Sequence, residues 1–128
     1  MSSNTEIVQR FIDTWASRDL EAILGFFAED ARYHNIPMEP LNGVTEIRAA
    51  LAGFVWMATE IEWITHHISE SAAGVVLTER NDRFLVNGVW VDLPVMGTFE
   101  LTDGKISGWR DYFDIKMFEA AMAATAAG

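Results

Sequence analysis

Two hydrophobic periods divide the chain near residue 60. Before that point, hydrophobic residues recur every three or four positions, which is the period of an amphipathic helix. After it, hydrophobic and polar residues alternate, as in a strand with one buried face. From residue 114 the pattern becomes helical again. Helices followed by a series of antiparallel strands and a final helix predict an α+β fold, in a single domain over residues 1–128.

The first half is predicted to contain three helices. Ser3 and Glu6 have the spacing of a capping box, and Asp19 is suited to cap a second helix that we expect to reach Phe27. The stretch YHNIPMEPLNG contains two prolines and an Asn-Gly pair, so it is predicted to be a loop after a short extended segment. A third helix is predicted over residues 44–57.

The second half is predicted to contain four strands. Asn87-Gly88 and Asp103-Gly104 are strong signals for two-residue hairpin turns. A strongly bent sheet that wraps around the helices would enclose a cavity. The tail is expected to be a helix that frays toward its end. The predicted strands are 60–70, 73–86, 89–101 and 105–113.

Composition narrows the possible partners. The 128 residues include nine basic and nineteen acidic side chains, which give a net charge of −10 and a pI near 4.5. Such a surface repels phosphate backbones and anionic lipids, so we expect neither nucleic acid nor a membrane surface as a partner. The chain has no cysteine, no visible signal peptide and no apolar run long enough to cross a bilayer. These features predict a soluble, cytoplasmic protein.

The stretch GWRDYFD places a carboxylate among large aromatic residues. If it is a strand, Trp109, Asp111 and Phe113 share one face, because successive side chains of a strand point to opposite faces. This aromatic face is the one expected to be buried. A charged group is almost never fully buried without a partner, so Asp111 requires a cation.

The stretch TERNDRF offers that cation. Arg80 and Asp82 are two residues apart and share a face, although the stretch alone fits a solvated edge strand with salt bridges better. The partner that Asp111 requires favours a different arrangement, in which Arg80 lies between both aspartates. This trio has a net charge of −1, which favours one further proton on a carboxyl in a poorly solvated cavity. Such a pair could act in general acid–base catalysis, or the trio could be purely structural.

Tyr33 and Asn35 form a third polar pair. They would share a face if their segment is extended, and a phenol and an amide together could hold one water molecule. Taken alone, the pair is better explained by Tyr33 in the core and Asn35 in a turn before Pro37.

These motifs together resemble the limonene-1,2-epoxide hydrolase family. The resemblance depends on Tyr-x-Asn-x-Pro at residues 33–37, TER-x-D at 78–82 and GKI-x-GWRDYFD at 104–114. It implies a cone-shaped fold of the nuclear transport factor 2-like (SnoaL-like) type. In this fold a curved mixed sheet and N-terminal helices surround a deep apolar pocket, and the protein is usually a homodimer.

The resemblance also implies a role for each polar residue. Asp111 would remove a proton from water, Tyr33 and Asn35 would hold that water, Asp82 would protonate the epoxide oxygen and Arg80 would bridge the aspartates. The implied reaction converts a small apolar epoxide, cyclic or aryl, into a vicinal diol in one step. No cofactor is expected, since the chain has no glycine-rich phosphate loop.

Seven residues are candidates for the pocket lining, and no metal ligands are expected. His66 and His67 cannot both bind one metal from a regular strand, because adjacent side chains point to opposite faces. The lining candidates are hydrophobic residues of the third helix, the segment just after it, the strands and the tail: Phe54, Ala58, Phe84, Leu93, Val95, Phe113 and Phe118.

Two other functions remain open. An isomerase or cyclase on the same fold would use one aspartate as a base and form an oxyanion site from a tyrosine and a neutral acid. A module that only binds a small apolar ligand, or only dimerises, is the second alternative, because fold does not determine function. Turnover of a panel of small epoxides, measured beside a Δ5-ketosteroid, would distinguish these possibilities.

Overall fold

The computed structural model describes residues 3–126. The ends of the predicted domain, residues 1–2 and 127–128, therefore lie outside the described residues. In chain order the elements are α1 (Asn4–Thr14), the short 3-10 helix η1 (Trp15–Ser17), α2 (Leu20–Leu24), β1 (Phe27–Asn35), β2 (Leu41–Asn42), α3 (Val44–Met57), β3 (Glu60–Glu70), β4 (Val76–Val86), β5 (Val89–Thr102), β6 (Lys105–Tyr112) and α4 (Ile115–Ala126).

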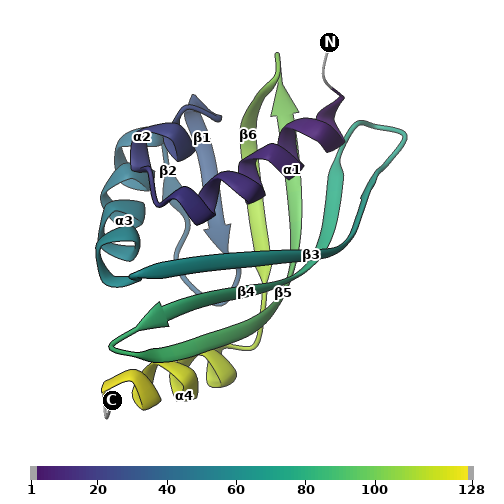
Figure 1. The fold of residues 1–128 in the computed structure, drawn as a ribbon. Coiled ribbons are helices and arrows are strands. Elements are labelled where there is room, and N and C mark those ends of the chain that lie inside the picture. The colour runs from purple at the N-terminus through teal and green to yellow at the C-terminus, as the bar shows by residue number, and fades with distance from the viewer. Residues whose placement is uncertain (1–2, 127–128) are drawn as a thin grey trace.

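The strands form one mixed six-stranded sheet. Its order is β2-β1-β6-β5-β4-β3, with β1 parallel to β6 and every other neighbouring pair antiparallel. The sheet is strongly bent, α1 crosses one of its faces, and α4 lies below β4 and β5 (Figure 1). The predicted α+β fold with a curved mixed sheet is confirmed.

The predicted caps and turns are present. The Ser3 hydroxyl accepts from the Glu6 N–H at 3.1 Å, and the Asp19 carboxylate accepts from the N–H of Ala22 at 3.1 Å. In both predicted hairpin turns the two turn residues have positive φ, at 51° and 76° for Asn87-Gly88 and 51° and 77° for Asp103-Gly104. Positive φ at both positions suits the twist of the flanking strands.

Two predicted boundaries are wrong. The second helix ends at Leu24, and Phe27 is the first residue of β1, which is longer than the short extended segment expected. Pairing with β6 explains the change, because the Ile106 N–H donates to the Phe26 carbonyl oxygen at 2.8 Å. A partner strand eighty residues away thus overrides the local helical spacing. The strand predicted from residue 73 begins at Val76, and the final helix is regular from Ile115 to Ala126.

The core lies between α1 and the concave face of the sheet. Phe11 of α1 makes edge-to-face contacts with several aromatic rings, including Trp15 at 6.0 Å and Trp109 at 5.1 Å between centroids. Aromatic pairs of this geometry add to the stability that burial alone gives. Between residues 3 and 126, no helix combines the length and hydrophobicity that crossing a bilayer would need.

Candidate active site

Parallel pairing of β1 with β6 brings two motifs together. Tyr33 lies beside Trp109 in the register, and Asn35 lies beside Asp111. The phenol of Tyr33 donates to the Asn35 side-chain oxygen at 3.1 Å, and its ring stacks on the Trp109 indole with centroids 4.0 Å apart. The phenol–amide pair therefore lies next to Asp111, as a shared site requires.

Arg80 holds both aspartates. Its Nε and Nη2 donate to the two oxygens of Asp82 at 2.9 and 2.8 Å, while Nη2 and Nη1 donate to the two oxygens of Asp111 at 2.9 and 3.3 Å. Nη1 also donates to the Thr78 hydroxyl at 3.0 Å. The Arg80 side chain is fully buried, and all three of its nitrogens have acceptors. The structure thus contains the arginine bridge that the sequence predicted.

The solvated-edge interpretation of TERNDRF is wrong for this face. Strand β4 lies between β3 and β5 rather than at the edge of the sheet. Thr78, Arg80, Asp82 and Phe84 are all buried on its concave face. Only the residues that point the other way, such as Glu79, take part in exposed contacts.

Gly97 of β5 makes the bridge possible. Arg80 on β4 must reach over β5 to meet Asp111 on β6, and Gly97 is the register partner of both Thr78 and Asp111. A Cβ atom at residue 97 would lie 2.4 Å from the Asp111 Oδ1 and 2.5 Å from the Arg80 Nη1. A glycine inside a strand often marks such a close approach, so Gly97 was a visible signal in the sequence that the prediction of the site did not include.

Burial and neighbouring charges set the protonation of this cluster. Burial raises the pKa of Asp82 to about 6, aided by the negative charge of Asp111 and opposed by Arg80. Burial also raises the pKa of Tyr33, and the charge of Asp111 adds to the rise, so the phenol stays protonated. Burial lowers the pKa of Arg80, but the two carboxylates more than reverse this, so it stays charged. Near pH 6 the cluster therefore contains a buried acid that can give up a proton.

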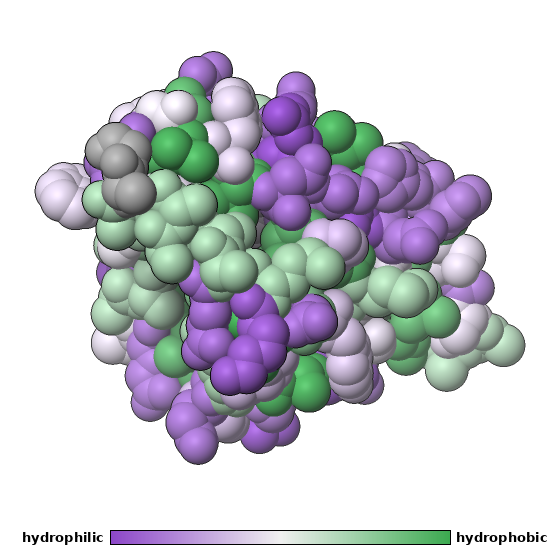
Figure 2. Space-filling view, turned by 90° about the horizontal axis from the view of Figure 1, so that it is seen from below, coloured by the Kyte–Doolittle hydropathy of each residue, from purple (hydrophilic) through white to green (hydrophobic). Residues whose placement is uncertain are grey.

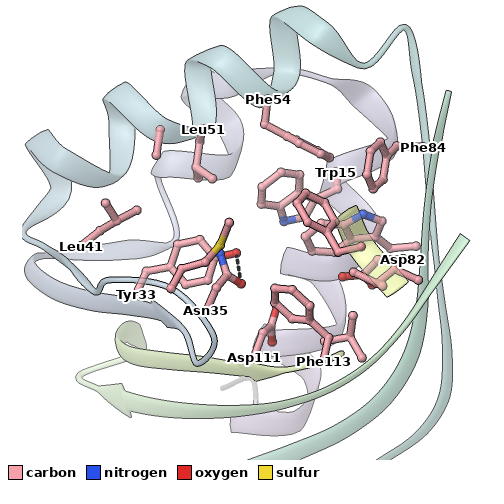
Figure 3. Close-up of a pocket in the computed structure, with 16 residues that line it drawn as sticks. Trp15, Tyr33, Asn35, Leu41, Leu51, Phe54, Asp82, Phe84, Asp111 and Phe113 are labelled. Atoms are coloured by element: carbon pink, nitrogen blue, oxygen red, sulfur yellow. Dashed lines mark hydrogen bonds between the residues drawn. The ribbon is translucent and has the colours of Figure 1, made fainter. Parts of the chain in front are cut away.

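A largely apolar cavity of about 180 Å³ opens beside this cluster. In Figure 3, Tyr33, Asn35, Asp82 and Asp111 lie on the strand side of the cavity, and Leu51 and Phe54 reach toward them from α3. The residues around the cavity are Trp15, Tyr33, Asn35, Met38, Leu41, Ala50, Leu51, Phe54, Trp63, Asp82, Phe84, Leu93, Val95, Asp111, Phe113 and Phe118.

Six of the seven lining candidates are in that wall: Phe54, Phe84, Leu93, Val95, Phe113 and Phe118. Ala58 is the exception. It lies where α3 ends, donates its N–H to the Phe54 carbonyl oxygen at 2.9 Å and is fully buried in the hydrophobic core. The sequence spacing correctly predicts that Ala58 points inward, but its short side chain packs in the core and does not reach the cavity.

Several residues of the site were not predicted from the sequence. Trp15 and Trp63 stack on each other in the wall, with centroids 4.1 Å apart, and come from segments 48 residues apart in sequence. Trp109 donates its indole N–H to the Oδ1 of Asp111 at 2.7 Å. For Trp109 the signal was visible, since two residues on one face of a strand are two positions apart.

One end of the cavity lies against α4. Phe113 and Phe118 line it, and their rings meet edge to face with centroids 5.9 Å apart. Figure 2 shows the face of the molecule where α4 lies, with a band of hydrophobic residues between two groups of hydrophilic ones. The tail helix therefore contributes directly to the shape of the pocket.

The prediction that His66 and His67 face opposite ways is wrong. The β3–β4 register shifts between Thr65 and His67, so His66 is the extra residue of a bulge. Both histidines are exposed on the convex side, where His66 contacts the Asn81 side-chain oxygen at 2.7 Å and His67 lies 4.0 Å from Glu79. Neither histidine lies in the cavity wall.

Comparison with known proteins finds relatives among epoxide hydrolases. A family model described as the limonene-1,2-epoxide hydrolase catalytic domain matches residues 2–123. Epoxide hydrolase EphG of Mycobacterium tuberculosis is 30% identical over 111 residues, which cover 84% of this chain and 71% of EphG.

Solved structures share the fold. An epoxide hydrolase of M. tuberculosis, described as similar to limonene-1,2-epoxide hydrolase, superposes with a TM-score of 0.82 at 26% identity, covering 97% of this chain and 92% of that one. The epoxide hydrolase/cyclase-like enzyme SalBIII gives 0.81 at 22% identity, covering 88% and 92%. A Catenulispora acidiphila protein with a ketosteroid isomerase-like fold gives 0.80 at 17% identity, covering 95% of both chains. These likenesses confirm the nuclear transport factor 2-like fold, which also carries other chemistry.

Proposed function

Because the chain belongs to the limonene-1,2-epoxide hydrolase family, we propose that it is an epoxide hydrolase that adds water to a small apolar epoxide. One observation carries the proposal. Two buried carboxyls share one guanidinium at the polar end of an apolar cavity, with a phenol–amide pair beside one of them. Opening an epoxide requires a nucleophile at carbon and a proton at oxygen, and this arrangement can supply both.

Asp111 is the base in this proposal, and Asp82 is the acid. Asp111 takes a proton from a water molecule that Tyr33 and Asn35 hold, and the water oxygen bonds to an epoxide carbon. The carbon–oxygen bond of the ring breaks, and its electron pair takes the proton of Asp82. Asp111 ends neutral and Asp82 ends ionised, so one proton must return from Asp111 to Asp82 before the next turnover. The raised pKa of Asp82, about 6, supports its role as the proton donor.

The cavity supports an uncharged substrate of modest size. Arg80, the cation of the cluster, is already committed to the two aspartates, and the rest of the wall is mainly aliphatic and aromatic. A cavity of ~150 Å³ can hold benzene. We therefore propose cyclic or aryl epoxides of roughly six to ten carbons as substrates.

We also propose that the protein is a homodimer. Leu77, Met96 and Tyr112 are exposed on the convex face of the sheet, at 45%, 57% and 48%. Exposed apolar side chains that gather on one face are typical of a protein–protein interface. Light scattering coupled to size-exclusion chromatography should give twice the mass of one chain. A monomer mass would refute the proposed homodimer.

Turnover of an epoxide panel beside a Δ5-ketosteroid tests the reaction. We expect diol formation, with Asp111→Asn and Asp82→Asn each lowering kcat by at least ~10²-fold while the protein stays folded. With ¹⁸O-labelled water, the label should enter the diol in the first turnover. A label delayed to later turnovers would indicate a covalent enzyme ester. Turnover of the ketosteroid without any epoxide turnover would favour the isomerase alternative.

A further inference from the structure

The two aspartates that share Arg80 are not hydrogen-bonded equally. Asp82 accepts one hydrogen bond on each oxygen, and both come from Arg80. Asp111 accepts two from Arg80 and a third from the indole N–H of Trp109, at 2.7 Å to Oδ1. The indole bond is the shortest of the three. Within residues 3–126, the Trp109 indole is the donor that bonds to Asp111 and has no counterpart at Asp82.

The third bond also distinguishes the two oxygens of Asp111. A carboxylate oxygen has about two lone-pair sites. Oδ1 receives both Arg80 Nη1 and the Trp109 indole, whereas Oδ2 receives only Arg80 Nη2. Among the described residues, the Asp111 Oδ2 therefore keeps one lone-pair site without a donor, and Asp111 lines the cavity.

From this asymmetry we infer that Trp109 is a positioning residue: its indole N–H orients the Asp111 carboxylate and leaves Oδ2 as the oxygen that takes the proton. An indole N–H can donate but cannot accept, so it stabilises the ionised carboxylate rather than the neutral acid. The inference rests on the proposed function for its role in catalysis, but the hydrogen bond itself can be tested without turnover.

The packing of Trp109 supports such a role. The residue is fully buried, stacked on Tyr33 at 4.0 Å and on Phe99 at 5.4 Å, with interplanar angles of 9° and 18°. Its ring is thus fixed between two others, which orients its N–H toward Asp111. The same indole supports Tyr33, so one side chain orients both the base and the phenol proposed to hold the water.

Two other indoles show that this bond is not a general result of burial. Trp15 and Trp63 also line the cavity, yet their buried indole N–H groups have no hydrogen-bond acceptor within the part of the chain that the structure describes. The contact of Trp109 with a carboxylate is therefore specific to its position two residues before Asp111.

The direct test is an NMR titration of the five tryptophan indole N–H groups in ¹⁵N-labelled protein. We expect the Trp109 resonance to shift with pH. The midpoint of this shift should coincide with the acid limb of the kcat/KM profile, which is the pH range where kcat/KM falls on acidification. In Asp111→Asn, whose amide is a weaker acceptor, the same resonance should move upfield further than the other four. If the Trp109 resonance does neither, the inference is wrong, whatever the substrate of the enzyme is.

The kinetic test uses Trp109→Phe, which removes the donor but keeps a ring in the stack. Hydrogen bonds to charged groups are typically worth at least a tenfold change in equilibrium, so the acid limb should move up by roughly one pH unit. Phe11→Leu is the matched control, because Phe11 packs on the Trp109 ring without bonding to the cluster. It should lower Tm and leave the limb in place.

The outcomes separate the inference from the proposed function. A folded Trp109→Phe variant with the parental limb would overturn the role of Trp109, and so would an equal shift in Phe11→Leu. If Trp109→Phe does not fold, the NMR titration of the parent decides. If the parent opens no epoxide, the proposed function fails, while the titration still tests the hydrogen bond between Trp109 and Asp111.

Discussion

Two arginines three residues apart on β4 show how burial decides the role of an ion pair. Arg80, on the concave face, is fully buried and bonded to Asp82 and Asp111. Arg83, on the convex face, keeps 29% of its side chain exposed.

Arg83 also has two acidic partners. It contacts Glu62, lies 3.5 Å from Asp92 and covers the Trp90 ring at 4.6 Å. The residue types of the two networks are therefore alike, and only the concave network is buried. Residue composition therefore does not distinguish the two networks, whereas the face of the strand on which each one lies does.

Replacing each arginine with methionine should give the largest contrast. Arg80→Met leaves two buried carboxyls without a cation, which typically costs ~3–5 kcal/mol. Arg83→Met removes the ion pairs with the exposed carboxylates of Glu62 and Asp92 and should cost no more than ~1 kcal/mol. Denaturant unfolding at pH 7 measures both. Equal effects would mean that burial does not separate the two networks.

The pH dependence of Arg80→Met sharpens this contrast. Without the cation, the buried carboxyl pair holds protons to a higher pH than the same groups in the unfolded chain. The folded state then binds more protons, so stability should fall as pH rises. Activity should do the reverse and return in part, because Asp111 must be ionised to act as a base. If stability and activity of Arg80→Met both match the parent and stay constant between pH 5 and 9, Arg80 does not bridge the two aspartates.

Asp82 gives the parent protein its own pH signature. Its folded pKa of about 6 lies above the ordinary value of 3.8, so between these values the folded state binds more protons. The contribution to stability is complete below about pH 4 and is lost as pH rises through about 6, with a total of ~3 kcal/mol. In Asp82→Asn this component should be missing. We would measure thermal midpoints of both proteins from pH 4 to 7, where parallel curves would disprove the shift.

The fold could be predicted from the sequence wherever the signals are local. The capping residues Ser3 and Asp19, the two hairpin turns and the third helix over 44–57 were each specified by a few neighbouring residues. Parallel pairing of β1 with β6 has no such local signal. The family resemblance implied a mixed sheet but not which strands run parallel, and this explains why the predicted boundary at Phe27 is wrong.

The candidate site divides in the same way. The polar residues Arg80, Asp82 and Asp111 could be selected because a charge on an aromatic face requires a partner. Of the wall residues from helices, Phe54 and Phe118 were selected but Trp15 and Leu51 were not, because the bend of the sheet decides which inward helix residues face the cavity. Ala58 shows the opposite error, since inward spacing does not say how far a short side chain reaches.

Replacing Gly97 with alanine should destabilise the protein, whereas the same replacement at Gly53 should not. Gly97→Ala would place a methyl group 2.4 Å from Asp111 and 2.5 Å from Arg80, and overpacking of this kind typically costs ~1–3 kcal/mol. Activity should fall too, because the bridge must shift. Gly53→Ala is the control: it lies inside α3 with nothing within 4 Å, so it should stabilise by ~0.5–1 kcal/mol. Equal effects would show that the contact at residue 97 is relaxed at no cost.

The smallest expected loss of unfolding free energy is for a substitution at Glu62, on the convex side. It tests whether solvent exposure, rather than residue type, sets the strength of an ion pair. Glu62→Gln removes one partner of Arg83, and because the pair is exposed, the loss should be below ~1 kcal/mol. The Debye length falls to ~3 Å at 1 M salt, so even this difference from the parent should shrink there.

The cost of Arg80→Met should persist at the same salt, because ions do not enter the buried cluster. Unfolding both variants at 0.05 and 1 M NaCl makes the comparison. A salt response of equal size in both would mean that water and ions reach Arg80, and its two carboxyls could then not be the poorly solvated pair that the proposed chemistry needs.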